Sequence, residues 1–158
     1  MKKLLLSAFL VAGTFCADAQ ETRFGVKAGV DIASMTVDLG PLGEVTGNET
    51  GFFVGAFAEI GVNETFAIQP EVLYVGIKDF NMINVPVLGK FTFAEDFSAM
   101  AGPSINYLLD AEEDEFKVNV DVAVGYAITE DIDASARYSI GFGDVKISGL
   151  FIGVGYKF

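Results

Sequence analysis

The segment FKVNVDVAVGYAI, residues 116–128, alternates between two kinds of side chain. Its even-numbered residues are all aromatic or branched and apolar, whereas its odd-numbered residues include Lys117, Asn119 and Asp121. A repeat of two is typical of a β-strand, because successive side chains of a strand point to opposite faces. The segment therefore predicts a strand with one apolar face and one polar face.

The same repeat recurs from Arg23 to Phe158, and no segment in this region shows a helical repeat. We predict eight strands, at residues 23–34, 51–61, 65–77, 81–93, 97–109, 116–128, 131–142 and 147–158. One face of these strands is bulky and carries no charged residue. The other face is rich in glycine and carries charges of both signs.

The two faces predict where the protein resides. Eight strands enclose a space wide enough only for side chains or one small ligand, so the bulky face must point outward. An apolar exterior requires lipid, and a sheet in lipid must close so that every backbone polar group is paired. A soluble barrel, the alternative, would have to hold the bulky face inside. We therefore predict an all-β fold, an eight-stranded antiparallel up-and-down transmembrane β-barrel in the bacterial outer membrane.

The connections alternate in the way such a barrel requires. With both chain ends in the periplasm, every second connection is expected to be a short turn, at Gly61–Thr65, Ala94–Asp96 and Thr129–Asp131. The remaining connections are expected to be outer loops, at residues 35–50, 110–115 and 143–146, of which the first is the longest.

Three prolines lie inside the predicted strands, at Pro70, Pro86 and Pro103. Each proline removes one hydrogen bond from the ladder between strands. We therefore expect local bulges at these positions.

The first twenty residues differ from the rest. Lys2 and Lys3 precede a short apolar run, and Ala17-Asp18-Ala19 matches a cleavage pattern, so residues 1–20 are predicted to be a cleaved signal peptide and 21–158 the barrel domain. The only cysteine, Cys16, lies in this segment, so we expect no disulfide in the exported chain. The net charge of −12 argues against nucleic acid as a partner.

Catalytic chemistry is not indicated. The chain has no histidine, which excludes a Ser-His-Asp triad and a histidine metal site. We predict no catalytic residue, no cofactor and no metal-binding residue. Buried charges need partners, so we expect a structural ion-pair network inside the barrel; a catalytic or transport role is the alternative. Its members are Lys27, Glu59, Glu71, Lys90, Asp121 and Arg137.

The strongest run of acidic residues lies at 110–115. Hard cations prefer oxygen ligands, so this run could bind Ca²⁺ or Mg²⁺. It lacks the glycine and the spacing of an EF-hand, and we favour a solvated outer loop.

Four segments together resemble the outer-membrane β-barrel domain family common in Bacteroidetes, which is related to the PorT-like proteins and to OmpA- and OmpX-like eight-stranded barrels. They are FGVKAGV at residues 24–30, QPEVLY at 69–74, NVPVLGKF at 84–91 and GVGYKF at 153–158. The resemblance spans most of the chain after residue 20. It implies an eight-stranded barrel in the outer membrane and little about activity.

The last predicted strand carries apolar residues at alternate positions and ends in an aromatic one. This pattern resembles the C-terminal signal of outer-membrane barrels, and its residues are Leu150, Ile152, Val154, Tyr156 and Phe158. The expected partners are therefore outer-membrane lipid, the barrel-assembly machinery and periplasmic chaperones. A last strand that ends in a girdle of aromatic residues is a further interpretation of the pattern.

The sequence as a whole favours a membrane-anchored structural or interaction scaffold with outward loops over an open porin. Loop 35–50 is the best candidate for contact with an unknown protein partner, because loops on a rigid scaffold often carry function. A narrow transporter and an accessory subunit of a secretion system stay open as alternatives.

Overall fold

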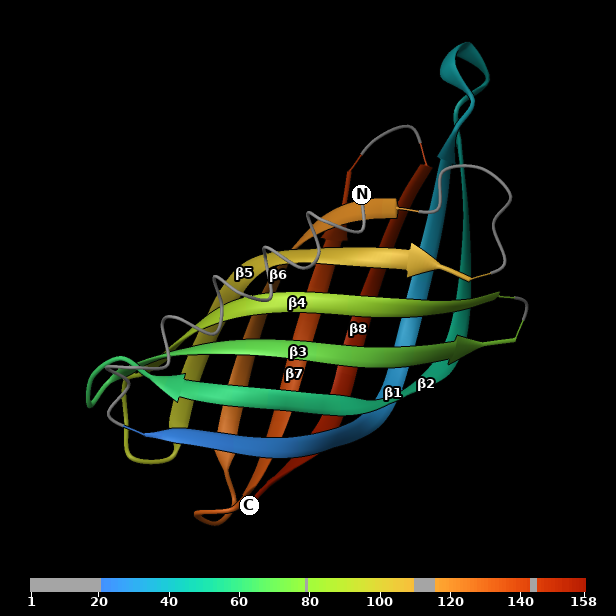
Figure 1. Ribbon diagram of the computed structural model, residues 1–158. Helices are drawn as coiled ribbons and strands as arrows, with labels where there is room; N and C mark the ends of the chain where they lie inside the picture. The colour runs from blue at the N-terminus through green and yellow to red at the C-terminus, as the bar shows by residue number, and fades with distance from the viewer. Residues whose placement is uncertain (1–20, 79, 110–115, 143–144) are drawn as a thin grey trace, which may run out of the picture.

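The computed structural model describes residues 21–78, 80–109, 116–142 and 145–158. In these residues eight antiparallel strands form one closed barrel, in which β1 pairs with both β2 and β8 (Figure 1). The predicted fold class is therefore confirmed. The strands are β1 Thr22–Asp38, β2 Glu44–Gly61, β3 Phe66–Ile77, β4 Phe80–Thr92, β5 Phe97–Leu108, β6 Phe116–Ala127, β7 Ile132–Gly141 and β8 Val145–Lys157. No helix in the described ranges is long and apolar enough to cross a membrane.

The side chains divide between the two faces of the barrel as the repeat of two predicts. On the bulky face, Val122 and Tyr138 are 45% and 47% exposed. On the polar face, Glu71 and Arg137 are only 1% and 5% exposed. The apolar set therefore covers the outside of the barrel, and the charged set lies inside.

The predicted long loop at residues 35–50 is wrong. β1 continues to Asp38 and β2 begins at Glu44, so most of this segment is a two-stranded hairpin. Thr36 and Thr46 face each other across it, with 3.0 Å between their hydroxyl oxygens. Gly40 and Gly43 have positive φ angles of 62° and 96°, which let the chain reverse tightly around the short 3₁₀ turn η2 at Gly40–Leu42.

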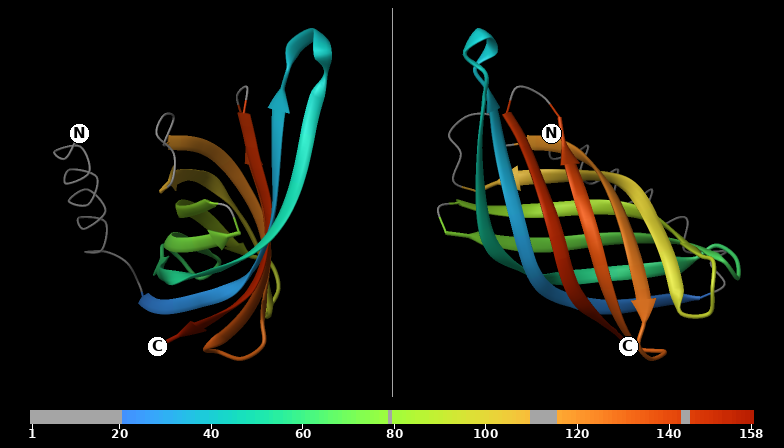
Figure 2. Two further views of the ribbon diagram at one scale, coloured as in Figure 1. Left: turned by 90° about the vertical axis from the view of Figure 1, so that its right-hand side faces the viewer. Right: turned by 180° about the vertical axis from the view of Figure 1, so that it is seen from behind.

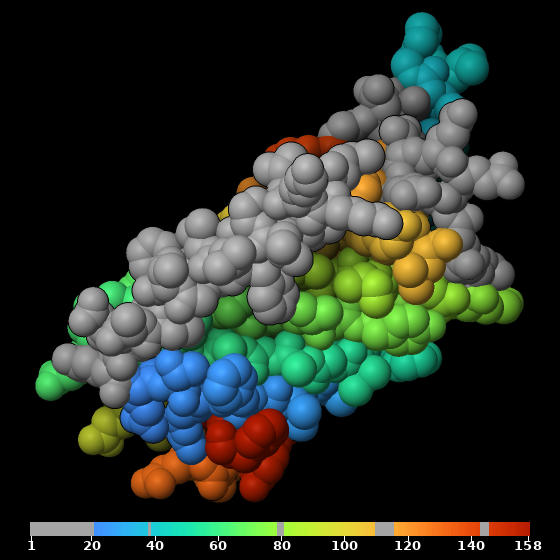
Figure 3. Space-filling view, in the orientation of Figure 1, coloured from blue at the N-terminus to red at the C-terminus, as the bar shows by residue number. Residues whose placement is uncertain are grey.

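The hairpin between β1 and β2 is the most prominent feature of the outline. It extends beyond the ends of the other strands in both views of Figure 2. In the space-filling view its tip stands clear of the barrel at the upper right (Figure 3). The pairing of β2 with β3 starts only at Phe52, so residues 44–51 of β2 lie outside that ladder.

The opposite end of the barrel holds the start of β1 and the end of β8, where Gly25 pairs with Lys157 (Figure 2). The three connections at this end are the short turns that the sequence predicted. In two of these turns, a side-chain oxygen near the start of the turn accepts hydrogen bonds from backbone amides that follow it. The Asn63 Oδ1 atom accepts hydrogen bonds from the amides of Thr65 and Phe66, and the Thr129 hydroxyl accepts from the amide of Ile132.

The prolines do not produce the expected bulges. In the β3–β4 ladder the register is the same at Pro70, which pairs with Val87, and at Leu73, which pairs with Asn84. The β4–β5 register is likewise unchanged on both sides of Pro86. A proline removes an N–H group without inserting a residue, so the ladder opens locally while the strands stay in step.

The interior also contains an apolar part that the sequence interpretation missed. The Phe53 and Phe151 rings pack edge to face, with centroids 5.5 Å apart. They belong to one buried cluster, which consists of Ala33, Phe53, Leu73, Val75, Ile77, Met82 and Phe151. Ala33 and Ile77 lie toward the hairpin end of their strands, so this cluster packs the inside of the barrel on that side.

Candidate functional site

The middle of the barrel is organised around one carboxylate, that of Glu71 on β3. The Lys27 Nζ atom of β1 donates a hydrogen bond to Glu71 Oε1 over 2.6 Å. The Arg137 Nη1 atom of β7 donates to Glu71 Oε2 over 2.9 Å. The Gln69 amide donates to Glu71 Oε1 over 2.7 Å. Both oxygens of this buried carboxylate are therefore used, as burial of a charge requires.

Arg137 connects this carboxylate to three further strands. Its Nη2 atom donates to the Asn84 Oδ1 atom of β4 over 2.8 Å, and its Nε atom lies 3.5 Å from Asp121 Oδ2 on β6. Its guanidinium carbon lies 4.3 Å from the centroid of the Phe151 ring on β8. We call Lys27, Glu71, Asp121 and Arg137 the central network.

Neutral side chains extend the central network around the barrel wall. The Ser104 hydroxyl of β5 donates to Asp121 Oδ1 over 2.8 Å. The Asn84 amide donates to the Asn106 Oδ1 atom over 2.7 Å, which links β4 to β5. Through these contacts the central network joins strands on every side of the interior. These strands are far apart in the sequence.

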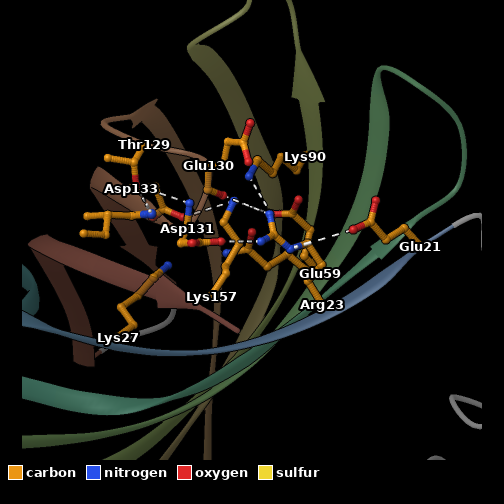
Figure 4. A network of polar contacts seen from close by, with 12 residues as sticks. Glu21, Arg23, Lys27, Glu59, Lys90, Thr129, Glu130, Asp131, Asp133 and Lys157 are labelled. Atoms are coloured by element: carbon orange, nitrogen blue, oxygen red, sulfur yellow. Dashed lines mark hydrogen bonds and ion pairs between the residues drawn. The ribbon is translucent and has the colours of Figure 1, made fainter.

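A second group of charges lies nearer the chain ends. The Lys90 Nζ atom lies 2.6 Å from Glu59 Oε2, and the Lys157 Nζ atom lies 3.7 Å from both Glu59 Oε2 and Asp133 Oδ2. Figure 4 shows these side chains converging from β2, β4, β7 and β8. We call Glu59, Lys90, Asp133 and Lys157 the lower network.

The rim at the same end carries an exposed ion pair. The Arg23 Nη2 atom lies 2.6 Å from Asp131 Oδ1, and Arg23 Nη1 donates to the Glu130 carbonyl oxygen over 2.9 Å (Figure 4). Glu21 lies 3.9 Å from the same guanidinium group. These contacts tie the start of β1 to the turn between β6 and β7.

The six residues singled out from the sequence fall into these two interior groups. Four of them make up the central network, while Glu59 and Lys90 pair in the lower network. The sequence interpretation did not assign partners to Gln69, Asn84 and Asn106, nor did it include Lys157. The alternation of side chains along each strand indicates that these residues face inward. It does not show which inward-facing residues contact one another.

The interior is closed to water at the level of the central network. Asp31, Glu71, Asn84, Asn106 and Asp121 come from five different strands, and each is at most 2% exposed. Water therefore barely reaches the side chains that ring this level. Chemically, the Glu71 and Asp121 carboxylates act as acceptors for buried donors within the protein.

The predicted C-terminal motif lies on the outside of β8. Ile152, Val154 and Tyr156 are 46%, 50% and 50% exposed, and Phe158 is 71% exposed. β8 joins β1 along most of its length and so closes the sheet. The motif is thus both the apolar outer face of the last strand and part of the seam of the barrel.

The hairpin carries exposed apolar side chains at and near its tip. Leu42 is 88% exposed and Val45 is 60% exposed. Leu39, before the 3₁₀ turn, is 47% exposed. Leu39 and Leu42 lie beyond the end of β1, which distinguishes them from the apolar belt around the barrel wall. Val45 lies opposite Val37, which pairs with Val145 at the start of β8.

A closed sheet with an apolar outer face and a charged, filled interior defines a membrane-embedded β-barrel. The family model described as outer membrane protein beta-barrel domain matches residues 5–158. The chain belongs to this family and is an outer-membrane barrel protein. No curated protein sequence matches it significantly.

Several solved structures share the fold. Ail of Yersinia pestis, solved with the heparin analogue sucrose octasulfate, is 16% identical with a TM-score of 0.60, covering 88% of this chain and 100% of that one. Neisserial surface protein A is 17% identical with a TM-score of 0.52 and covers 88% and 100%. The N-terminal barrel of OprF from Pseudomonas aeruginosa is 11% identical with a TM-score of 0.52 and covers 87% and 100%. At these identities the likeness concerns the fold alone.

Proposed function

We propose that this protein is a membrane-anchored scaffold that holds the β1–β2 hairpin outside the cell for contact with a partner, and that it neither conducts solutes as a porin nor catalyses a reaction. The observation that carries the proposal is the filled interior. Glu71, with its oxygens bound by Lys27 and Arg137, occupies the space through which a solute would pass. The exposed apolar tip of the hairpin supports the interaction role.

The proposed orientation puts the short turns in the periplasm and the hairpin outside. Outer-membrane barrels generally have short periplasmic turns and longer extracellular connections. Here the three short turns, the start of β1 and the end of β8 lie at one end, and the protruding hairpin lies at the other. Residues 1–20 would act as the signal peptide, and the C-terminal motif on β8 would bring the chain to the barrel-assembly machinery.

Labelling of single cysteines tests this orientation. In a chain with Cys16→Ser, we expect Leu42→Cys to react with a membrane-impermeant maleimide on intact cells. We expect Glu64→Cys, in the turn between β2 and β3, to react only after the outer membrane is permeabilised. Both residues are exposed, so accessibility differs only through the membrane. Labelling of Glu64→Cys alone on intact cells would reverse the orientation and remove the basis for an external hairpin.

Conductance in planar bilayers separates the scaffold from its main alternative, a narrow transporter. We expect no steady current steps from the inserted protein, because buried side chains fill the barrel at the level of the central network. A porin inserted in the same membranes provides the positive control, and heat-modifiable migration in gels verifies that the barrel is folded. Reproducible steps from folded protein would support transport and contradict the scaffold.

The chemistry of the hairpin limits the class of partner. Ail was solved with the heparin analogue sucrose octasulfate, but the hairpin here carries Glu44 and Glu49, and the Lys146 Nζ atom lies 3.2 Å from Glu44 Oε1. Polyanions are repelled by such a surface. We therefore infer a protein partner with an apolar or basic contact surface. The resemblance to PorT-like proteins suggests a secretion system as one source of such a partner, which co-purification of its components in mild detergent would test.

A further inference from the structure

One buried carboxylate is left over when the interior charges are paired. In the central network Lys27 and Arg137 face Glu71 and Asp121, so the charges balance. Asp31 on β1 lies in the same interior and is 0% exposed. Neither of its two carboxylate oxygens has a hydrogen-bond partner. Among the described residues, then, Asp31 is a buried carboxyl group with no cation in contact.

Arg137 is a candidate to neutralise Asp31, but it forms no ion pair with it. Nη1 donates to Glu71 and Nη2 to Asn84, while Nε, which forms no hydrogen bond, lies 3.5 Å from Asp121 Oδ2. Lys27 is held by Glu71 at 2.6 Å. An isolated buried carboxylate costs several kcal/mol in a medium that excludes water, so an unpaired one calls for a ligand.

Asp31 shares a small cavity with a second unpartnered oxygen. The cavity has a volume of about 10 Å³ and is lined by Asp31, Asn119, Ser139 and Ser148 among others. The Asn119 amide donates to the Ser139 hydroxyl and to the Ile147 carbonyl oxygen, each over 2.9 Å. Those bonds leave its Oδ1 atom buried and without a hydrogen bond. The unpartnered atoms that line this cavity are therefore all acceptors.

The backbone makes room for the Asp31 carboxylate at this place. Gly149 on β8 faces it, and a Cβ atom at that position would lie 2.7 Å from Asp31 Oδ1. The cavity lies against apolar side chains as well, namely Met82, Ile147 and Phe151. These neighbours offer no hydrogen bond, and they raise the cost of a bare charge.

We propose that Asp31 and Asn119 form an internal binding site for one monovalent metal cation, with Na⁺ as the natural occupant. A hard cation takes oxygen ligands, which the Asp31 carboxylate, the Asn119 amide oxygen and the Ser139 hydroxyl supply. One positive charge balances the one unpaired carboxylate, whereas a divalent ion would leave an excess.

The size of the cavity selects a bare ion. A site needs roughly 10–15 Å³ to hold a single water molecule, so this cavity has space for one particle of that size. A hydrated ion does not fit, and the oxygen atoms of the protein must replace the hydration shell. This requirement favours Na⁺, the smaller of the two common monovalent metal ions. The bound ion would join β1 to β6 from inside the barrel.

Thermal unfolding in matched salts tests the site. The protein is refolded in a zwitterionic detergent, and NaCl is replaced stepwise by choline chloride at constant ionic strength. We expect Na⁺ to raise the Tm of the wild-type barrel by roughly 5 °C, because a ligand that binds only the folded state stabilises it. Choline is too large to enter the cavity, so it serves as the reference.

Two variants that each remove one negative charge make the test specific. Asp31→Asn removes the charge of the site, so its Tm should not respond to Na⁺ and should exceed that of the wild type in choline. Asp131→Asn removes an exposed carboxylate paired with Arg23, and it should keep the full response. Broadening of the sodium NMR signal by wild type and Asp131→Asn, but not by Asp31→Asn, would support the proposal directly.

Three outcomes would overturn the proposal. A wild-type Tm that is the same in Na⁺ and choline means that Asp31 carries a proton and needs no ion. A Na⁺ response that persists in Asp31→Asn means that the ion acts elsewhere. Stabilisation by Ca²⁺ in place of Na⁺ contradicts the monovalent assignment.

Discussion

Replacing Glu71 with glutamine is expected to lower the free energy of unfolding by about 3–5 kcal/mol, the range for breaking a buried ion pair. The substitution keeps the shape of the side chain but removes the charge that Lys27 and Arg137 share. Both cations are at most 6% exposed, so water cannot replace the lost carboxylate. Urea unfolding of the barrel in lipid vesicles measures the difference.

The turn residue Glu64 provides the matched control. Glu64→Gln makes the same chemical change at an exposed site, where substitutions usually alter stability by no more than about 0.5 kcal/mol. An equal effect of the two substitutions would mean that the central network contributes nothing particular to stability. A large effect of Glu71→Gln alone would identify the central network as the main polar contribution to the stability of the barrel.

Replacing Val122 with arginine should destabilise the barrel by about 2–4 kcal/mol, the cost of a cation on the lipid face near the bilayer centre. Val122 is 45% exposed and lies in the middle of β6. In a barrel surrounded by water the same change would cost little. The substitution therefore measures whether the apolar belt contacts acyl chains.

Val45→Arg tests the other apolar surface. Val45 is 60% exposed and lies in the hairpin beyond the first pair of β2 with β3. In the proposed orientation this residue is outside the membrane, and we expect a change below about 0.5 kcal/mol in the same vesicles. Equal costs for Val45→Arg and Val122→Arg would contradict the proposed boundary between the membrane and the hairpin.

These predictions share one physical basis. Acyl chains are as apolar as the outer side chains, and they offer no polar partner. Inward-facing charges must therefore find their partners within the barrel. Except at Asp31, the described interior meets this demand with shared carboxylates rather than with isolated pairs, as at Glu71 and Glu59.

Two errors of the sequence interpretation have clear causes. Residues 35–50 are polar and rich in glycine and threonine, which is typical of a loop, yet Thr36 and Thr46 pair across a hairpin. Pairing with a partner strand compensates for weak local preference, and the sequence does not show that partner. The prolines were expected to produce local bulges, but the many pairs on either side hold the strands in step.

The amino-acid sequence alone determined the class of fold, the number of strands and the face on which each side chain lies. It did so because the repeat of two is a local property of an extended chain, and because charge is excluded from one face throughout. Only the tertiary structure decided that Lys27 and Arg137 share Glu71 and that Asp31 is left without a partner. Those outcomes depend on strand register and on distances across the closed barrel, which join residues remote in the chain.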